Sequence, residues 1–372
     1  MPPRQYVCWG ARGLLGCLRV SRKRANTQNE GWQMARRLAV TVGFGGTPEQ
    51  NKEIIKRVQV AEEVGVEAVF TAETWGRDQF SLLTQLAMAT SKIKLGTGIA
   101  PVYGRSPAVL AMTAATLDEL SGGRVVLGLG TSGARVIEHW HGQPFEKPIQ
   151  RTKEYVEIIN MIVSGEKVFY EGEIFKLQRG FKLLFEPVRK HIPIYVASIS
   201  PKSMVNVGAA ADGWMPIYWP KSKFAEGKAA VAKAAVKAGR PADAVECVAS
   251  LTVVLNPDVA KAKVQAAGPI SWYVTNMGDF YHQMLTRNGF GEEVAAMRKA
   301  AEEHRPAPFG TNPEIMAAMG ERMLDETAIY GDLETVAAGI EERRELGVDL
   351  PSISMPQGDL QQVEKVLGAL VS

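Results

Sequence analysis

The segment from Thr116 to Ala134, TLDELSGGRVVLGLGTSGA, constrains the fold most, because a helix end, a strand and a glycine-rich loop follow one another directly. Gly122 and Gly123 are suited to the left-handed conformation that ends a helix, and the apolar run VVLGL after Arg124 predicts a buried strand. The loop at 130–134 has only small residues and hydroxyls, so a flat ligand can approach its backbone N–H groups. Taken alone, the segment fits a ligand-binding loop and a tight strand-to-helix turn equally well.

The pattern of that segment repeats along the chain from Leu38 onward, where short apolar strands alternate with longer helical patterns. Alternation of this kind is typical of βαβ units and a parallel sheet. The number of strands is close to eight, which predicts an α/β fold of the (β/α)₈ TIM-barrel type with insertions, whose site lies at the carboxyl ends of the strands. The predicted strands lie near Leu38–Phe44, Ala68–Ala72, Ile93–Ile99, Val125–Leu129, Ile194–Ala197, Gly213–Ile217, Glu246–Leu255 and Ser352–Met355.

Several helices are predicted to begin at a hydroxyl residue followed by proline. Thr47-Pro48, Ser106-Pro107 and Ser200-Pro201 each combine an N-cap hydroxyl with proline at the first helical position. Gln50 completes a capping box with Thr47. Each of these caps follows a predicted strand, as the barrel interpretation requires.

Two intervals are too long for a simple helical connection. Residues 167–177 alternate between apolar and polar and predict a β-hairpin that turns at Glu171-Gly172. Residues 257–330 hold at least two helical patterns and an aromatic cluster, which either roofs a pocket or packs against the barrel or a second subunit. The cluster consists of Trp272, Tyr273, Phe280 and Tyr281.

Composition restricts the partners and the compartment. A formal charge of +3 in 372 residues, without a basic run, argues against nucleic acid, and no stretch has the roughly 20 apolar residues of a membrane span, so a small-molecule substrate is expected. The three cysteines have no metal-binding or disulfide spacing, which favours a cytoplasmic location. Residues 1–37 differ from the rest and are interpreted as a peripheral, disordered extension or a misassigned start, with Met34 as the alternative first residue. Residues 38–372 are interpreted as one barrel domain.

Longer motifs make the chain similar to a known family. It resembles the bacterial-luciferase-like flavin and deazaflavin oxidoreductases, particularly those that use coenzyme F420, over roughly 38–357. The motifs that carry the resemblance are IKLGTGI (93–99), RSPAVLAMTAATLDELSGGRVVLGLGTSG (105–133), HWHG (139–142), PIYVASISPKS (193–203) and ADGWMP (211–216). The resemblance implies a TIM barrel, commonly a homodimer, with the cofactor ring across the carboxyl ends of the strands.

The same resemblance implies which residues hold the cofactor. Gly98-Ile99 is similar to a position where the family often has a non-prolyl cis peptide behind the ring. The helix capped at Ser200 presents free N–H groups to a phosphate, which agrees with the family's anion-binding turn, although ordinary capping would also explain Ser200 without a ligand. The expected cofactor-binding residues are Glu73, Gly98, Ile99, Gly130, Thr131, Ser132, Gly133, Ala197, Ser198, Ile199 and Ser200, with Arg77, Arg105, Arg135 and Lys202 as candidates for a positive rim.

The expected catalytic residues are Glu73, Thr74, Trp75 and His141. Glu73 either contacts the polar edge of the ring or pairs with Arg77 and caps a helix. Some relatives have a histidine where this chain has Thr74, so the proton donor stays open. His141 is placed to meet a substrate, although a surface position is the commoner one for a histidine.

The expected function is hydride transfer between reduced F420 and a small organic substrate with a C=C, C=N or C=O group, or in reverse from an alcohol. Two alternatives remain: an FMN-dependent luciferase-like monooxygenase, and a flavin-binding barrel without catalysis. No metal is expected, because no histidine or carboxylate has metal-ligand spacing.

Overall fold

The computed structural model describes residues 36–304 and 312–372. Residues 1–35 of the predicted extension at 1–37 therefore lie outside the described residues. Arg36 and Arg37 are described and belong to the barrel, because the Arg36 amide donates to the Val371 carbonyl oxygen at 2.9 Å and Arg37 pairs with Glu67 and Glu246.

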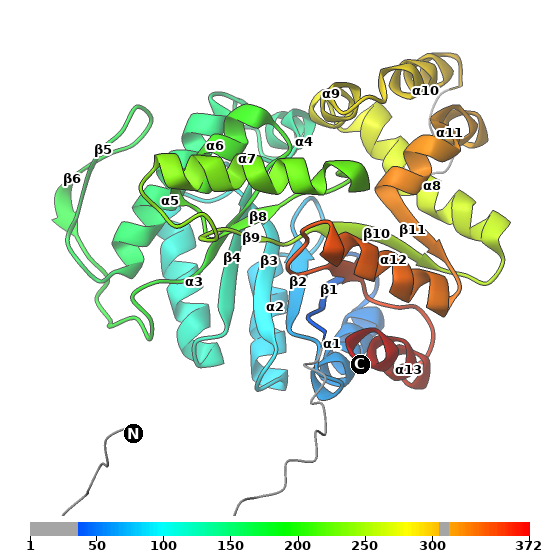
Figure 1. Ribbon diagram of the computed structural model, residues 1–372. Coiled ribbons are helices and arrows are strands. Elements are labelled where there is room, and N and C mark those ends of the chain that lie inside the picture. Colours follow the sequence, from blue (N-terminus) through cyan, green and yellow to red (C-terminus); the bar gives the residue numbers. More distant parts are fainter. Residues whose placement is uncertain (1–35, 305–311) are drawn as a thin grey trace, which may run out of the picture. The chain divides into compact units, whose positions relative to one another are not determined.

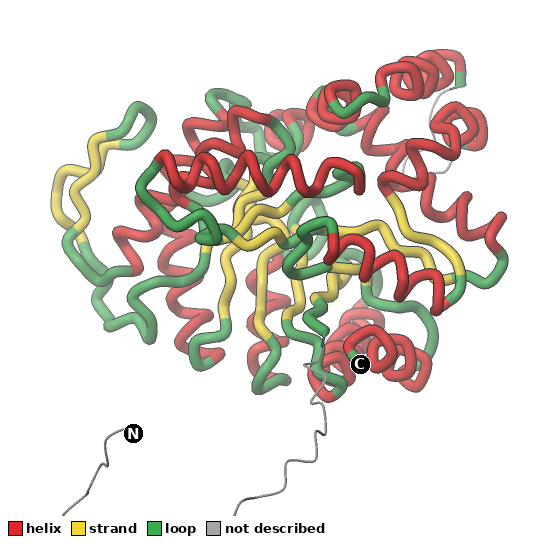
Figure 2. The backbone as a smooth tube through the Cα atoms, in the orientation of Figure 1, coloured by secondary structure: helices red, strands yellow, loops and turns green. Residues whose placement is uncertain are grey.

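A central parallel sheet surrounded by helices forms the body of the described chain (Figures 1 and 2). Among the described residues, ten strands are hydrogen-bonded in the order β11-β10-β12-β1-β2-β3-β4-β7-β8-β9. The strands are β1 Ala39–Val42, β2 Ala68–Ala72, β3 Lys94–Pro101, β4 Val125–Gly130, β7 Ile194–Ala197, β8 Gly213–Met215, β9 Glu246–Cys247, β10 Ser250–Leu255, β11 Ala328–Gly331 and β12 Ser352–Ser354.

Two of these strands close the barrel. β9 and β10 are the two halves of the strand predicted at Glu246–Leu255; β9 pairs with β8, whereas β10 pairs with β12. A parallel bridge between Ile217 and Ser250 continues the ladder across the join. The eight predicted strand positions are therefore confirmed, and β11 is an additional strand beside β10 that the sequence pattern did not predict.

The helices surround the strands. They are α1 Pro48–Glu63, α2 Gln79–Ala89, α3 Pro107–Ser121, α4 Ala134–His139, α5 Pro148–Val163, α6 Pro201–Ala210, α7 Phe224–Lys237, α12 Leu333–Glu345 and α13 Leu360–Val371, with the short 3₁₀ helix η1 at Lys221–Lys223. The helices α1 and α13, from the two ends of the described chain, pack against each other.

The predicted helix boundaries are confirmed at their caps. Thr47 and Gln50 form the reciprocal capping box of α1. Ser106 and Ser200 accept from the third helical N–H of α3 and α6. Gly122 ends α3 with φ of +70°.

The first insertion is the hairpin of β5 Val168–Glu171 and β6 Lys176–Phe181, which extends at the left of Figure 1. Its turn runs from Gly172 to Phe175 rather than at Glu171-Gly172, because the Gly172 N–H bonds the Phe175 carbonyl and the buried Glu154 carboxylate accepts the N–H groups of the turn. The second insertion contains α8 Val259–Asn276, α9 Phe280–Arg287, α10 Gly291–Glu303 and α11 Pro313–Thr327.

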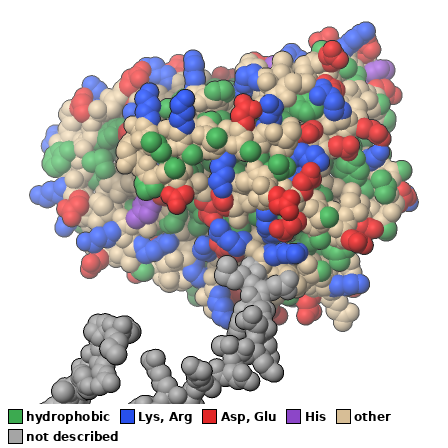
Figure 3. Space-filling model, viewed as in Figure 1, with side chains coloured by type: hydrophobic (Ala, Val, Ile, Leu, Met, Phe, Trp, Pro, Cys, Tyr) green, Lys and Arg blue, Asp and Glu red, His purple; other side chains and the backbone are tan. Residues whose placement is uncertain are grey.

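The lower interior of the barrel is filled by apolar side chains, among them Phe70, Val126, Tyr195, Met215 and Val248. This layer forms a floor below the open space at the carboxyl ends of the strands. No helix in the described part of the chain is long and apolar enough to cross a membrane. On the face shown in Figure 3, positive and negative side chains are interspersed.

Candidate active site

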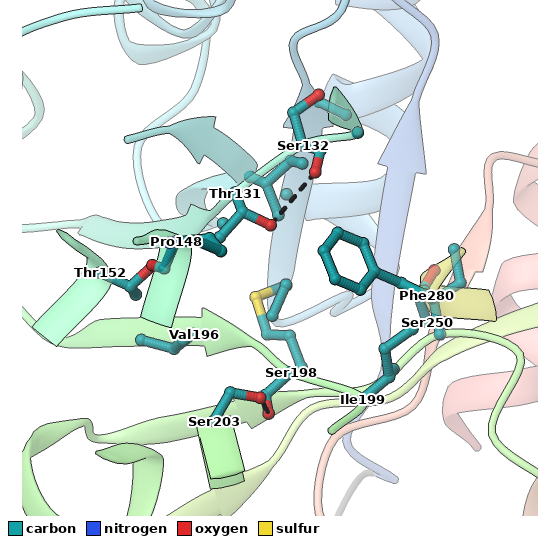
Figure 4. Close-up of a pocket in the computed structure, with 18 of the residues that line it drawn as sticks. Thr131, Ser132, Pro148, Thr152, Val196, Ser198, Ile199, Ser203, Ser250 and Phe280 are labelled. Atoms are coloured by element: carbon teal, nitrogen blue, oxygen red, sulfur yellow. Dashed lines mark hydrogen bonds between the residues drawn. The ribbon is translucent and has the colours of Figure 1, made fainter. Parts of the chain in front are cut away.

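A cavity of about 400 Å³ opens above the apolar floor at the carboxyl ends of the strands, where the barrel fold was expected to hold its site. We call it the barrel cavity; Figure 4 shows part of its lining. Of the expected site residues, the cavity brings together Thr74, Gly98, Ile99, Gly130, Thr131, Ser132, Gly133, Ala197, Ser198, Ile199 and Ser200.

The strands β2, β3, β4 and β7 give the cavity a side that has no polar side chains. We call this side the apolar wall. A wall of this kind accepts the face of a planar ring, because glycine and alanine let the ring approach the backbone. It consists of Phe70, Ala72, Gly98, Ile99, Gly130, Val196 and Ala197.

A β-bulge lies in the apolar wall at Gly98. Thr71 of β2 pairs with Thr97, but the next residue, Ala72, pairs with Ile99, so Gly98 is the extra residue. The predicted cis peptide at Gly98-Ile99 is wrong, because the described residues contain no cis peptide bond. The bulge accommodates the extra residue with trans peptides, without the cost of about 3 kcal/mol of a non-prolyl cis bond.

The loop after β4 borders the apolar wall. Ser132 has φ of +57°, a left-handed conformation that is uncommon outside glycine, and Thr131 donates from its hydroxyl to the Ser132 carbonyl at 3.1 Å (Figure 4). Gly133 precedes α4 and supplies no side-chain cap. The first amides of α4 therefore have no side-chain partner at this cap.

The loop after β7 carries a cluster of serine hydroxyls. Ser203 Oγ lies 2.5 Å from Ser198 Oγ and 2.8 Å from Ser200 Oγ, and Ser200 caps α6. Trp214 fixes the loop through its indole N–H, which donates to the Ser198 carbonyl at 2.8 Å. The start of α6 and these hydroxyls form the most polar end of the cavity, which suits an anion.

The start of α5 completes this end and was missed by sequence reasoning. Pro148, Ile149, Thr152 and Lys153 line the cavity beside Asn206 of α6, whose amide donates to the Ile149 carbonyl at 3.3 Å. The sequence did offer a signal for this helix start, because Pro148 stands at the beginning of a helical pattern. Lys153, which is ion-paired with Glu157 at 3.7 Å, is the only charged residue among the described lining residues, and it lies at the hydroxyl-rich end of the cavity.

The loop after β2 places Thr74 in the cavity but not Glu73. Glu73 accepts two hydrogen bonds at 2.9 Å from Arg105, and Asp78 also binds Arg105. The alternative pairing of Glu73 with Arg77 is wrong: Arg77 donates instead to carbonyls of the loop that follows β1. The contacts of Arg105 and those of Arg77 together hold the loop after β2 in place.

The Thr74 hydroxyl is buried in the lining, and no described group hydrogen-bonds it. An unpartnered buried hydroxyl costs about 1–3 kcal/mol, a cost that a bound ligand can remove. Trp75 is 38% exposed and is not a lining residue.

The remaining expected positions lie away from the lining. His141 packs against Gly104, and its Nε2 atom is buried without a hydrogen-bond partner among the described groups. None of the four candidate rim residues lines the cavity; Arg135 and Lys202 are exposed, and Arg77 and Arg105 are engaged as above. Whether His141 takes part in catalysis stays a prediction.

The helical insertion supplies the remaining wall. Tyr273, Met277, Phe280 and Tyr281 line the cavity, and Figure 4 shows the Phe280 ring pointing into it. Burial raises the pKa of the Tyr273 and Tyr281 hydroxyls, so both stay protonated at neutral pH. Three of the four residues of the predicted aromatic cluster thus roof the pocket, and they also pack together, with Tyr273 and Tyr281 rings 5.0 Å apart.

Three hydroxyl residues at the opposite side of the barrel were also missed. Thr41, Ser250 and Ser352 come from β1, β10 and β12 and line the cavity. Single hydroxyls inside strand patterns carry no signal of their own, so the sequence offered no means to single them out. No described Asp, Glu or His lines the cavity, and no described group of three or more such residues could hold a metal ion.

Comparisons with known proteins agree with this architecture. Residues 33–350 match the family described as luciferase-like monooxygenase. The chain is 30% identical to a Mycobacterium tuberculosis protein provisionally named a coenzyme F420-dependent oxidoreductase, over 90% of this chain and 99% of that protein. It is 32% identical to 5,10-methylenetetrahydromethanopterin reductase of Archaeoglobus fulgidus, over 81% of this chain and 89% of the relative.

A solved structure shares the fold. The coenzyme F420-dependent tetrahydromethanopterin reductase of Methanopyrus kandleri superposes with a TM-score of 0.76 at 25% identity, covering 91% of this chain and 98% of that chain.

Proposed function

Because the chain belongs to the luciferase-like monooxygenase family, we propose that it is a coenzyme F420-dependent oxidoreductase that transfers a hydride to or from a small organic substrate. The observation that carries the proposal is the barrel cavity, in which an apolar wall leads to an end rich in hydroxyls, helix N-termini and one lysine. A planar ring with an anionic tail fits this division.

The residues present fit the cofactor. The apolar wall accepts the ring face, and Thr74 offers an unpartnered hydroxyl. Ser132, Ser198 and Ser200 lie where a phosphate would receive hydrogen bonds, and Lys153 adds a positive charge at that end. When bound, F420 supplies the hydride donor or acceptor through its deazaflavin ring.

The protein contributes position and the exclusion of water. Tyr273, Phe280 and Tyr281 cover the cavity from the helical insertion, and the bulge at Gly98 supports its apolar wall. Holding two reactants face to face in this way supplies much of the rate enhancement of a hydride transfer. We assign Thr74 a direct contact with the ligands and Glu73 a positioning role, because only Thr74 lines the cavity.

The lining favours a C=N substrate. A positively charged C=N group becomes a neutral amine when it accepts a hydride, so it needs no proton from the protein. The described lining offers no carboxylate or histidine as a proton donor, which this reaction does not need; it also offers no carboxylate as a counter-ion, so the hydride itself neutralises the cation. Relatives named 5,10-methylenetetrahydromethanopterin reductase support the inclusion of that compound among the first substrates to test.

The decisive experiment is a fluorescence titration of the purified protein with oxidised F420 and with FMN. We expect F420 to bind at least tenfold more tightly, and reduced F420 to be oxidised by a panel of C=N, enone and ketone substrates without oxygen uptake. Preference for FMN with oxygen uptake indicates a flavin monooxygenase, and tight binding without turnover indicates a non-catalytic barrel.

We further propose a homodimer that forms through α2 and α3, which pack side by side. The α2 helix contains no charged residue, yet its Met88 is 74% exposed. On α3, Val109, Met112 and Leu120 form an exposed apolar stripe. Exposed apolar side chains on two adjacent helices are expected to be covered, and a second copy of the same two helices would cover them.

We also propose a reducing, cytoplasmic location. Cys247 is a buried free thiol, and burial raises its pKa, so it is neither a disulfide partner nor reactive.

A further inference from the structure

The barrel cavity has two chemically different sides where the strands end. Every lining side chain from β2, β3, β4 and β7 belongs to the apolar wall. By contrast, each lining side chain from β10, β12 and β1 bears a hydroxyl. We call these three residues, Ser250, Ser352 and Thr41, the hydroxyl trio.

The hydroxyl trio is contiguous because its strands are neighbours. Ser250 and Ser352 are register partners in the β10–β12 pair, and β12 pairs on its other side with β1. The hydroxyls of Thr41 and Ser352 lie 3.2 Å apart, within hydrogen-bond distance. More than 200 residues separate Thr41 from Ser250 in the chain, so barrel closure alone brings the trio together.

The hydroxyl trio retains unused hydrogen-bonding capacity. A hydroxyl donates one hydrogen bond and accepts two, and the bond between Thr41 and Ser352 occupies one donor and one acceptor site. No described group hydrogen-bonds the Ser250 hydroxyl. Polar groups that line a largely apolar pocket fix the orientation and the identity of what binds there.

The surroundings of the trio define the chemistry of its partner. Lys153, the charged residue of the described lining, belongs to α5 and lies at the anion end with α6. No described carboxylate, guanidinium or imidazole lines the cavity beside the trio. A charged group there would be desolvated without a counter-ion, so an uncharged group with hydrogen-bonding atoms fits best.

We propose that Thr41, Ser250 and Ser352 bind the substrate through an uncharged hydrogen-bonding group, such as a carbonyl, hydroxyl, amide or ring nitrogen. The cofactor ring covers the apolar wall, and the trio faces the ring across the cavity. The trio therefore selects the substrate and does not contribute to cofactor affinity. This inference rests on the proposed function, because it requires the ring at the apolar wall.

The test compares matched substitutions on the two sides of the cavity. Thr41→Val and Ser250→Ala, combined in one variant, remove hydroxyls from the trio, whereas Thr131→Val and Ser132→Ala make the same changes at the cofactor loop. Each protein is titrated with oxidised F420 and assayed with reduced F420 and the best substrate of the panel. The crystal structure of the wild-type F420 complex is determined in parallel.

We expect the trio variant to bind F420 within twofold of the wild type but to show at least a tenfold higher KM for the substrate. The cofactor-loop variant should show the reverse. In the F420 complex, the three hydroxyls should lie beyond hydrogen-bond distance of every cofactor atom. A tenfold loss of F420 affinity in the trio variant, an unchanged KM, or a hydrogen bond from the trio to the cofactor overturns the inference. Failure of the wild type to bind F420 refutes the proposed function instead.

Discussion

Arg105 donates from one guanidinium nitrogen to both carboxylate oxygens of Glu73, at 2.9 Å each. The side chains are only 18% and 13% exposed, so the pair is largely shielded from water. Arg105 also binds Asp78, and together these contacts fix the loop that carries Thr74 into the barrel cavity.

Glu73→Gln should therefore weaken the loop. We expect the free energy of unfolding to fall by about 1–3 kcal/mol, between the values for exposed and buried ion pairs, and F420 affinity to fall several-fold. Arg105→Gln and the double variant complete a thermodynamic cycle, measured by urea denaturation and F420 titration. The losses should be clearly less than additive. Additive losses would contradict the coupling.

Thr74→Val tests the unpartnered hydroxyl. Because no described group bonds it, its removal should leave stability unchanged or raise it by up to about 1–3 kcal/mol. Turnover with reduced F420 should fall at least tenfold, since the hydroxyl is the group we place against the ligands. Thermal unfolding and steady-state kinetics measure the two effects. Full activity in the valine variant excludes Thr74 from the chemistry.

Ser200→Asp tests the anion end. Aspartate caps a helix as well as serine does, so α6 should stay folded, while the added negative charge should weaken F420 binding at least tenfold. Ser106→Asp is the matched control, because Ser106 also caps a helix before proline but does not line the cavity. Equal F420 affinities in the two variants would move the phosphate site elsewhere.

The ion pairs beneath the barrel predict acid sensitivity. Burial alone raises the pKa of Glu67, but hydrogen bonds from Arg37 and Lys94 outweigh it and lower the pKa to about 2. A pKa below the unfolded value of about 4.3 gives stability that is present above that pH and is lost as the pH falls toward 2.

Glu67→Gln should accordingly reduce the free energy of unfolding at pH 7 by about 2–3 kcal/mol and flatten its decline between pH 5 and pH 2. Urea denaturation across that range measures both effects. Glu63→Gln, at an exposed position on α1, is the control and should follow the wild type. A Glu67 variant with the wild-type acid profile shows that the ion pairs do not stabilise the barrel.

Oligomeric state tests the exposed stripe on α3. We expect the wild-type protein to have about twice the chain mass of 40.5 kDa by light scattering, and Met112→Glu to dissociate it. Val236→Glu, at an exposed valine on α7, should leave the dimer intact. A monomeric wild type, or dissociation by both changes, would remove α2 and α3 as the interface.

Sequence alone predicted what local interactions determine. The strands follow from short apolar runs, and the starts of α1, α3 and α6 follow from a hydroxyl residue that is directly followed by proline. The glycine-rich loop after β4 was also predictable, since small side chains act at their own positions.

Tertiary structure decided which distant groups meet. Glu73 lies close to Arg77 in the chain, yet it pairs with Arg105 because the carboxyl ends of β2 and β3 are adjacent. The bulge at Gly98 depends on the register of β3 against its two neighbours, so no local pattern distinguishes it from a cis peptide. Closure of the barrel brings Thr41, Ser250 and Ser352 together, because hydrogen bonding between strands fixes their register only after the intervening chain has folded.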